Sequence, residues 1–151
     1  MDQKATSNVT YSKRWPDSKN SLSINLYSNR DLLVDKKVDR ASNYFVSPTN
    51  SGSQINISNK TLPKISFRHG QSSLFPSSAL YKKWYNNINW NYGFNFTKKD
   101  KNYYKSVFSD SLNSYDWQRD ENGNAIDTLF QDAGWTHTAS LNAPIKILKH
   151  I

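Results

Sequence analysis

The chain has 151 residues, of which 36% are hydrophobic and 14% aromatic, and its 20 Lys and Arg against 12 Asp and Glu give a net charge of +8. This length suits one domain with a core, and the aromatic content argues against a wholly disordered chain. The absence of cysteine excludes disulfides, thiolate metal sites and a thiol nucleophile.

The positive charge, with a sequence pI near 9.6, favours polyanionic partners such as RNA, DNA or anionic lipid. However, 15 lysines against 5 arginines also fit an AT-rich coding sequence without selection for binding, because phosphate recognition prefers arginine. No apolar run approaches the roughly 18 residues of a membrane-spanning helix. We therefore expect no transmembrane segment, and no secretory signal peptide at the polar N-terminus.

The first half of the chain is polar, with eleven basic and five acidic residues in 1–75. The alternation of Leu22, Ile24 and Leu26 predicts a strand at 21–27. A short helix is predicted at 30–40, where Leu33, Val34 and Val38 share one face.

Further along the first half, Ile55 with Ile57 and Ile65 with Phe67 predict two more short strands, and SPTNSGSQ at 47–54 predicts a loop. These weak signals predict that residues 1–75 form an extended, strand-poor basic arm.

The second half begins with a helix signal. Pro76 precedes two serines, and Leu80, Trp84 and Ile88 then follow at a spacing of four residues. This pattern predicts an amphipathic helix of about three turns.

Immediately afterwards the period changes to two. Trp90, Tyr92, Phe94 and Phe96 alternate with three asparagines and a glycine, which predicts a strand with one aromatic and one polar face. The aromatic side chains form either the core face of a sheet or a platform that stacks nucleobases or sugars beside nearby lysines.

The remaining residues predict short elements. KKDKN at 98–102 indicates a turn, and Tyr104, Phe108 and Leu112 predict a helix at 101–113. DENGN at 120–124 indicates a tight turn. Another helix is predicted at 125–133, closed by Gly134, followed by a strand from Trp135 to Leu141, and residues 145–149 are a further strand candidate.

Together these elements predict an α+β fold. Residues 76–149 are expected to form a compact core, a small aromatic-rich sheet with two or three short helices within 76–151, and residues 1–75 to form the arm that precedes it.

Catalytic groups are scarce. The three histidines, His69, His137 and His150, are far apart in sequence, which argues against a metal site. The acidic stretch around DENGN fails the EF-hand pattern, because aligning Gly123 as the loop glycine puts Gln118 and Leu129 at the two end ligand positions. No nucleotide-binding, hydrolase or metalloprotease motif occurs. We expect no enzyme activity, no catalytic residue, no cofactor and no metal.

The function that these features favour is a non-catalytic structural subunit of a large assembly, such as an organellar or ribosome-like ribonucleoprotein. Its partners would be other protein subunits and RNA, and its expected location is an organelle, the mitochondrion. The alternatives are a virion or secreted surface protein and a small carbohydrate-binding module. The candidate residues for binding RNA or a partner are Lys13, Arg14, Lys36, Lys37, Lys82, Lys83, Lys98, Lys99, Trp90 and Tyr92.

Overall fold

The structure is a computed structural model that describes residues 3–76 and 83–143. It is mostly antiparallel β-sheet, with 64% of residues in strands and 7% in helical turns. The strands are β1 (Lys4–Trp15), β2 (Asn20–Asp31), β3 (Gln54–Ser73), β4 (Asn89–Ser109), β5 (Ser114–Trp117) and β6 (Asp127–Asn142).

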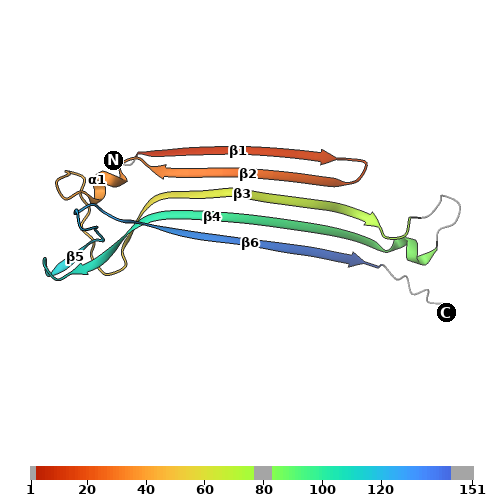
Figure 1. The fold of residues 1–151 in the computed structure, drawn as a ribbon. Helices are drawn as coiled ribbons and strands as arrows, with labels where there is room; N and C mark the ends of the chain where they lie inside the picture. The colour runs from red at the N-terminus through yellow and green to blue at the C-terminus, as the bar shows by residue number, and fades with distance from the viewer. Residues whose placement is uncertain (1–2, 77–82, 144–151) are drawn as a thin grey trace. The chain divides into compact units, whose positions relative to one another are not determined.

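These strands form a six-stranded sheet in the order β1-β2-β3-β4-β5, with β6 also paired to β4 (Figure 1). The two short helical elements lie between strands: α1 spans Val34–Val38 and the 3-10 turn η1 spans Trp84–Asn87. Neighbouring strands are therefore mostly neighbours in sequence, as expected for strands joined by turns.

Backbone hydrogen bonds fix the register of the first two strands. The Lys19 amide donates to the Pro16 carbonyl (3.1 Å) in the β1–β2 turn, where Lys19 adopts a φ of 55°, and the Leu32 amide donates to the Gln3 carbonyl (2.9 Å). Both contacts fit one register of the hairpin, in which Arg14 is opposite Ser21.

Two compact units share the strands. Unit 1 comprises residues 1–9, 25–63 and 97–133, and unit 2 comprises residues 10–24, 64–96 and 134–151. Each long strand therefore contributes one segment to each unit.

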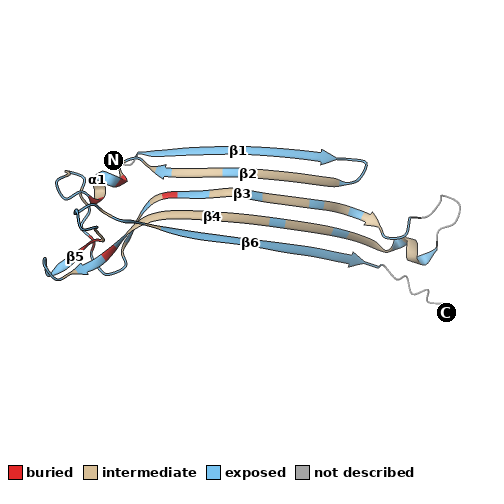
Figure 2. Ribbon diagram, in the orientation of Figure 1, coloured by how far each residue is buried: buried red, intermediate tan, exposed pale blue. Residues whose placement is uncertain are grey.

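Unit 1 contains the buried core of the described residues. Its buried apolar side chains include Val34, Val38 and Trp117, and its buried polar residues include Ser106 and Asp116. All the buried residues that the structure describes, red in Figure 2, belong to this unit.

Loop and strand segments of unit 1 are joined by specific hydrogen bonds. The Trp117 Nε1 donates to the Val46 carbonyl (2.8 Å), and the Ser106 hydroxyl donates to the Asn50 carbonyl (2.6 Å). These contacts hold the loop after α1 against β4 and β5.

The predicted α+β class is wrong. The error arises because large apolar residues spaced four apart were interpreted as helices. Residues 101–109 of the predicted helix lie in β4, and residues 127–133 of the next lie in β6. Because four is a multiple of the strand period of two, Tyr104 and Phe108 share a face in a strand as well as in a helix. The predicted helix that begins after Pro76 falls partly on residues outside the described ranges, and its described end forms only η1.

The extended arm and the turn at 98–102 are also wrong. Residues of the supposed arm form the paired strands β1, β2 and β3, and residues 98–102 continue β4. Cross-strand hydrogen bonds accommodate the charges there, from Lys101 Nζ to Gln54 (3.0 Å) and from Gln131 to Asp100 (3.3 Å). A boundary at residue 76 between an arm domain and a core domain stays a prediction.

Other local predictions are confirmed. The strand at 21–27 lies in β2, the short helix at 30–40 contains α1 with Val34 and Val38 buried, and the aromatic strand lies in β4. The tight turn at DENGN is present, with a φ of 84° at Gly123 and its amide bonded to the Asp120 carbonyl (3.0 Å). The final strand lies in β6, whereas residues 145–149 fall outside the described residues.

Candidate functional site

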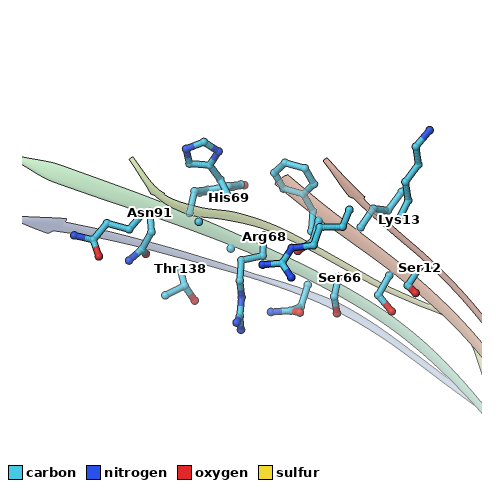
Figure 3. Close-up of a pocket in the computed structure, with 17 residues that line it drawn as sticks. Ser12, Lys13, Ser66, Arg68, His69, Asn91 and Thr138 are labelled. Carbon is cyan, nitrogen blue, oxygen red and sulfur yellow. The ribbon is translucent and has the colours of Figure 1, made fainter. Parts of the chain in front are cut away.

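In unit 2, the strand segments carry different chemistry on their two faces. In Figure 3 the side chains of His69 and Lys13 extend from one side of the ribbon, and those of Arg68, Ser66 and Thr138 extend from the other. Since successive side chains of a strand point to opposite faces, this view divides the residues of unit 2 into an apolar face and a polar face.

The apolar face is rich in rings that contact one another across strands. His69 stacks on Trp90 at 4.3 Å between ring centroids. Tyr92 lies 6.4 Å from Phe67, and its hydroxyl is hydrogen-bonded to Nδ1 of His137 (2.7 Å). These contacts join β3, β4 and β6 through aromatic pairs, which stabilise a sheet.

This apolar face is not covered by other described residues. Trp135 is 71% exposed, Leu141 64% and Tyr11 54%, and the four aromatic residues from Trp90 to Phe96 are only half-buried. A contiguous exposed apolar surface of this kind marks contact with a membrane, a ligand or another protein.

The polar face is hollowed. A groove of about 820 Å³ is lined mostly by polar-face residues of all five long strands, which are Ser12, Arg14, Ser21, Ser23, Ser66, Arg68, Gly70, Asn91, Gly93, Asn95 and Thr138. Its lining also includes Lys13, Leu22, Phe67, His69, Gln71 and Tyr92. None of these side chains is acidic, so the groove offers hydroxyl, amide and guanidinium groups.

Strand register aligns several of them in one row. The Gly70 amide donates to the Lys19 carbonyl (2.8 Å), which puts Arg68 opposite Ser21, itself opposite Arg14. The ring contacts of Phe67 with Tyr92 and of His69 with Trp90 align β3 with β4, so Arg68 and Asn91, which lie between these rings in sequence, are opposite one another. Asn91 accepts a hydrogen bond from the Ser140 hydroxyl through Oδ1 (2.7 Å). The row therefore runs Arg14, Ser21, Arg68, Asn91, Ser140, and its first four residues line the groove.

Charge is divided unevenly between the units. Unit 2 holds nine of the 20 basic residues and one of the 12 acidic residues, Asp17, whereas unit 1 holds eleven of each. The whole net charge of +8 thus belongs to unit 2.

A scan against protein-family models matches residues 1–151 to the family described as LptD protein. The chain belongs to the LptD family. No curated protein and no solved structure matches the chain in the corresponding searches.

LptD membership overturns the functional prediction from the sequence. The family points to outer-membrane lipopolysaccharide transport, not to a ribosome-like or organellar structural subunit, and it contradicts the ribonucleoprotein, RNA-binding and mitochondrial assignments. Net charge misled here because it does not identify which polyanion a protein meets. The prediction that the partners include other proteins is confirmed, since the LptD family works within a multi-protein transport complex. The predicted RNA partner has no support.

The candidate binding residues are dispersed over this LptD-family chain. In unit 2, Arg14 lines the groove, Lys13 lies over the Trp15 ring at 5.1 Å, and Lys83 lies over the Tyr85 ring at 5.8 Å. Trp90 and Tyr92 are on the apolar face, and Lys82 is outside the described residues. Their binding role stays a prediction.

The remaining candidates belong to unit 1. Lys36 and Lys37 lie in α1, where Lys37 pairs with Asp31 (2.7 Å) and Lys36 lies over the Tyr44 ring at 5.9 Å. Lys98 and Lys99 lie in β4.

Sequence reasoning missed Arg68, Ser21 and Asn91. The signal for Arg68 was present, because it alternates with Phe67 and His69 just as Asn91 alternates with Trp90 and Tyr92. The alternation along one strand does not specify the register between strands, and it is this register that puts Arg14 and Arg68 in one row.

Among the described residues, no group of three or more His, Asp or Glu side chains is placed to hold a metal ion. His69 and His137 are engaged with aromatic neighbours on the apolar face, and His150 lies outside the described ranges. Within those same ranges, no helix has the length and apolar character needed to cross a membrane.

Proposed function

We propose that this LptD-family chain is a non-catalytic part of the machinery for lipopolysaccharide transport at the outer membrane, and that the apolar face of unit 2 contacts the acyl chains of lipid. The family match supports the transport role. The observation that carries the assignment of the face is the uncovered band of aromatic and aliphatic side chains opposite a polar groove.

A sheet suits such a contact because backbone groups in hydrocarbon need hydrogen-bond partners within the protein. Neighbouring strands supply these partners for one another, so only the side chains decide what a face of the sheet contacts. Burial of apolar surface contributes about 25 cal/mol per Å², which favours lipid over water for the face bearing Trp90, Phe94 and Leu141.

The polar face has the opposite preference. Arg14, Arg68 and Asn91 are exposed, and transferring such groups into hydrocarbon without partners costs several kcal/mol. This face is therefore assigned to water and to the polar portion of the transported molecule.

The absence of cysteine allows a direct test with single labels. Phe94→Cys and Asn95→Cys place a fluorophore one residue apart on opposite faces of β4. We expect brominated acyl chains to quench the label at 94 strongly and the label at 95 weakly, and a water-soluble quencher to act in the reverse order.

A second matched pair, Leu141→Cys and Asn142→Cys, repeats the comparison in β6. The labelled chains are reconstituted into lipid vesicles and compared with the same chains in urea, where the difference between faces should vanish. Equal quenching of 94 and 95 by the brominated lipid, with the sheet intact by circular dichroism, would contradict the proposal.

A further inference from the structure

We propose that the row Arg14, Ser21 and Arg68 is a phosphate-binding subsite, and that its ligand is the phosphorylated sugar of a glycolipid headgroup. This inference rests on the proposed transport function and adds a specific recognition element to the groove of unit 2.

Geometry brings the two guanidinium groups to one place. Arg14 on β1 and Arg68 on β3 are each opposite Ser21 on β2, so their backbones are two strand spacings apart, about 10 Å. Both residues line the same groove, and Figure 3 shows Arg68 extending on the same side of the sheet as Ser66 and Ser12. A single phosphate group above Ser21 lies between them.

No carboxylate in the described part of the chain competes for these two arginines, so they can bind an anion. Within residues 3–76 and 83–143, neither guanidinium takes part in an ion pair, whereas Arg40 and Arg119 of unit 1 are both paired with Asp116. The one acidic residue of unit 2, Asp17, lies in the β1–β2 turn, outside the groove lining. An anion in the groove therefore meets positive charge without competition from a carboxylate of the lining.

The other groups of the row are hydrogen-bond donors. The Asn91 side chain uses its oxygen to accept from Ser140 (2.7 Å), which directs its amide NH₂ toward donation. Arginine forks with adjacent hydroxyl and amide donors match the several acceptor oxygens of a phosphate better than the uncharged hydroxyls of a sugar.

The two faces of the sheet together indicate that the phosphate belongs to a glycolipid. An apolar face suited to acyl chains lies across the same strands from a cationic groove, so an amphipathic phosphorylated molecule finds a matching surface for each of its parts. A free phosphate ion would use the groove alone.

The test measures binding of the full chain, in detergent micelles, to lipopolysaccharide and to the same lipopolysaccharide after removal of its phosphates. We expect the phosphorylated form to bind at least about tenfold more tightly. In Arg14→Gln/Arg68→Gln this preference should fall to within about twofold, and Arg68→Lys should lose part of it because lysine cannot bind phosphate in bidentate fashion.

Lys19→Gln is the matched control, since it removes one positive charge from the β1–β2 turn of the same unit, outside the groove lining. It should keep the preference within about twofold of the wild-type value. An equal loss in Lys19→Gln, or equal affinity of the wild type for the two lipopolysaccharides, would overturn the subsite.

Inorganic phosphate separates the two sources of the ligand. If inorganic phosphate displaces lipopolysaccharide only at high millimolar concentration, and the chain still prefers phosphorylated lipopolysaccharide, the ligand is the headgroup of the lipid. Tight binding of inorganic phosphate with no preference between the lipids would overturn it. Neither outcome of the phosphate experiment changes the expected quenching of the labels at positions 94 and 95. The phosphate subsite can therefore be disproved while the proposed function stands.

Discussion

Units 1 and 2 use charged residues in opposite ways. In unit 1 several carboxylates are engaged with neighbours: Asp31 with Lys37, Asp116 with Arg40 and Arg119, and Asp127 with Asn102. In unit 2 the charge is almost entirely positive, and Arg14 and Arg68 line a groove without a carboxylate.

The difference separates the charged residues that stabilise the fold from those that we propose for recognition. Arg119 donates to Asp116 Oδ2 (3.0 Å), to the Gly123 carbonyl (2.9 Å) and to the Val38 carbonyl (2.7 Å). These bonds join β5, the DENGN turn and the end of α1 around the buried core. Unit 2 has no buried residue within its described part, so its arginines are not enclosed in a core of this kind.

The largest expected effect compares two arginines. Arg119→Gln should lower the free energy of unfolding by about 2–4 kcal/mol, because Asp116 and two carbonyls lose a charged donor. Arg68→Gln, its counterpart in unit 2, should change it by less than about 0.5 kcal/mol. Chemical denaturation of both variants in one detergent measures the contrast, and equal losses would show that unit 2 also depends on arginine for its fold.

A smaller effect is expected from acid. Although burial by itself raises the pKa of Asp116, hydrogen bonds from Arg119, Arg40 and the backbone lower it below its ordinary value of 3.8. The folded state therefore binds this proton more weakly than the unfolded state, so the contribution of Asp116 is complete above pH 3.8 and is lost as the pH falls through the lowered value.

Asp116→Asn should flatten the dependence of stability on pH below 3.8, whereas Asp110→Asn, at an exposed position of the same unit, should retain the slope of the wild type. Denaturation curves at a series of pH values provide the comparison. A wild-type slope in Asp116→Asn would assign the acid sensitivity to another group.

Next in size is a pair of tryptophans. Trp117→Phe removes the hydrogen bond to the Val46 carbonyl (2.8 Å) from a side chain that is 2% exposed, and should cost roughly 1–2 kcal/mol. Trp135→Phe, at a position that is 71% exposed, should cost less than about 0.5 kcal/mol. Thermal unfolding followed by circular dichroism compares them, and a larger loss for Trp135 would place a core in unit 2.

The smallest contrast concerns two glycines whose added Cβ would meet no atom within 4 Å. Gly123 in unit 1 has a φ of 84°, so Gly123→Ala should destabilise by about 1 kcal/mol through backbone strain. Gly134 lies inside β6 of unit 2, and Gly134→Ala should instead stabilise by about 0.5 kcal/mol. Opposite signs in the same denaturation assay are the expected result, and a loss at Gly134 would contradict it.

Much of the strand structure could be predicted locally. The period of two in Leu22–Leu26, Trp90–Phe96 and Trp135–Leu141 identified strands because alternation is the direct consequence of strand geometry. Longer strands were missed where charged residues interrupted the alternation, as at 98–102, and where a spacing of four imitated a helix.

The candidate site was harder to predict. Arg14 was identified as a binding residue from its charge, but Arg68 was not, because residues 54 positions apart come together only through strand pairing. Alternation was readable in several strands, but it did not indicate which of their faces would lie side by side in the sheet.

By itself, the sequence of this protein determined its charge, its lack of cysteine, the alternating aromatic strand and the local turns, since these depend on residue type and on contacts between near neighbours. The tertiary structure alone decided that the supposed arm is a set of paired strands, that all the net charge falls in unit 2, and that two distant arginines face one serine. Register and strand order are set by hydrogen bonds between residues far apart in the chain, and no local pattern specifies them.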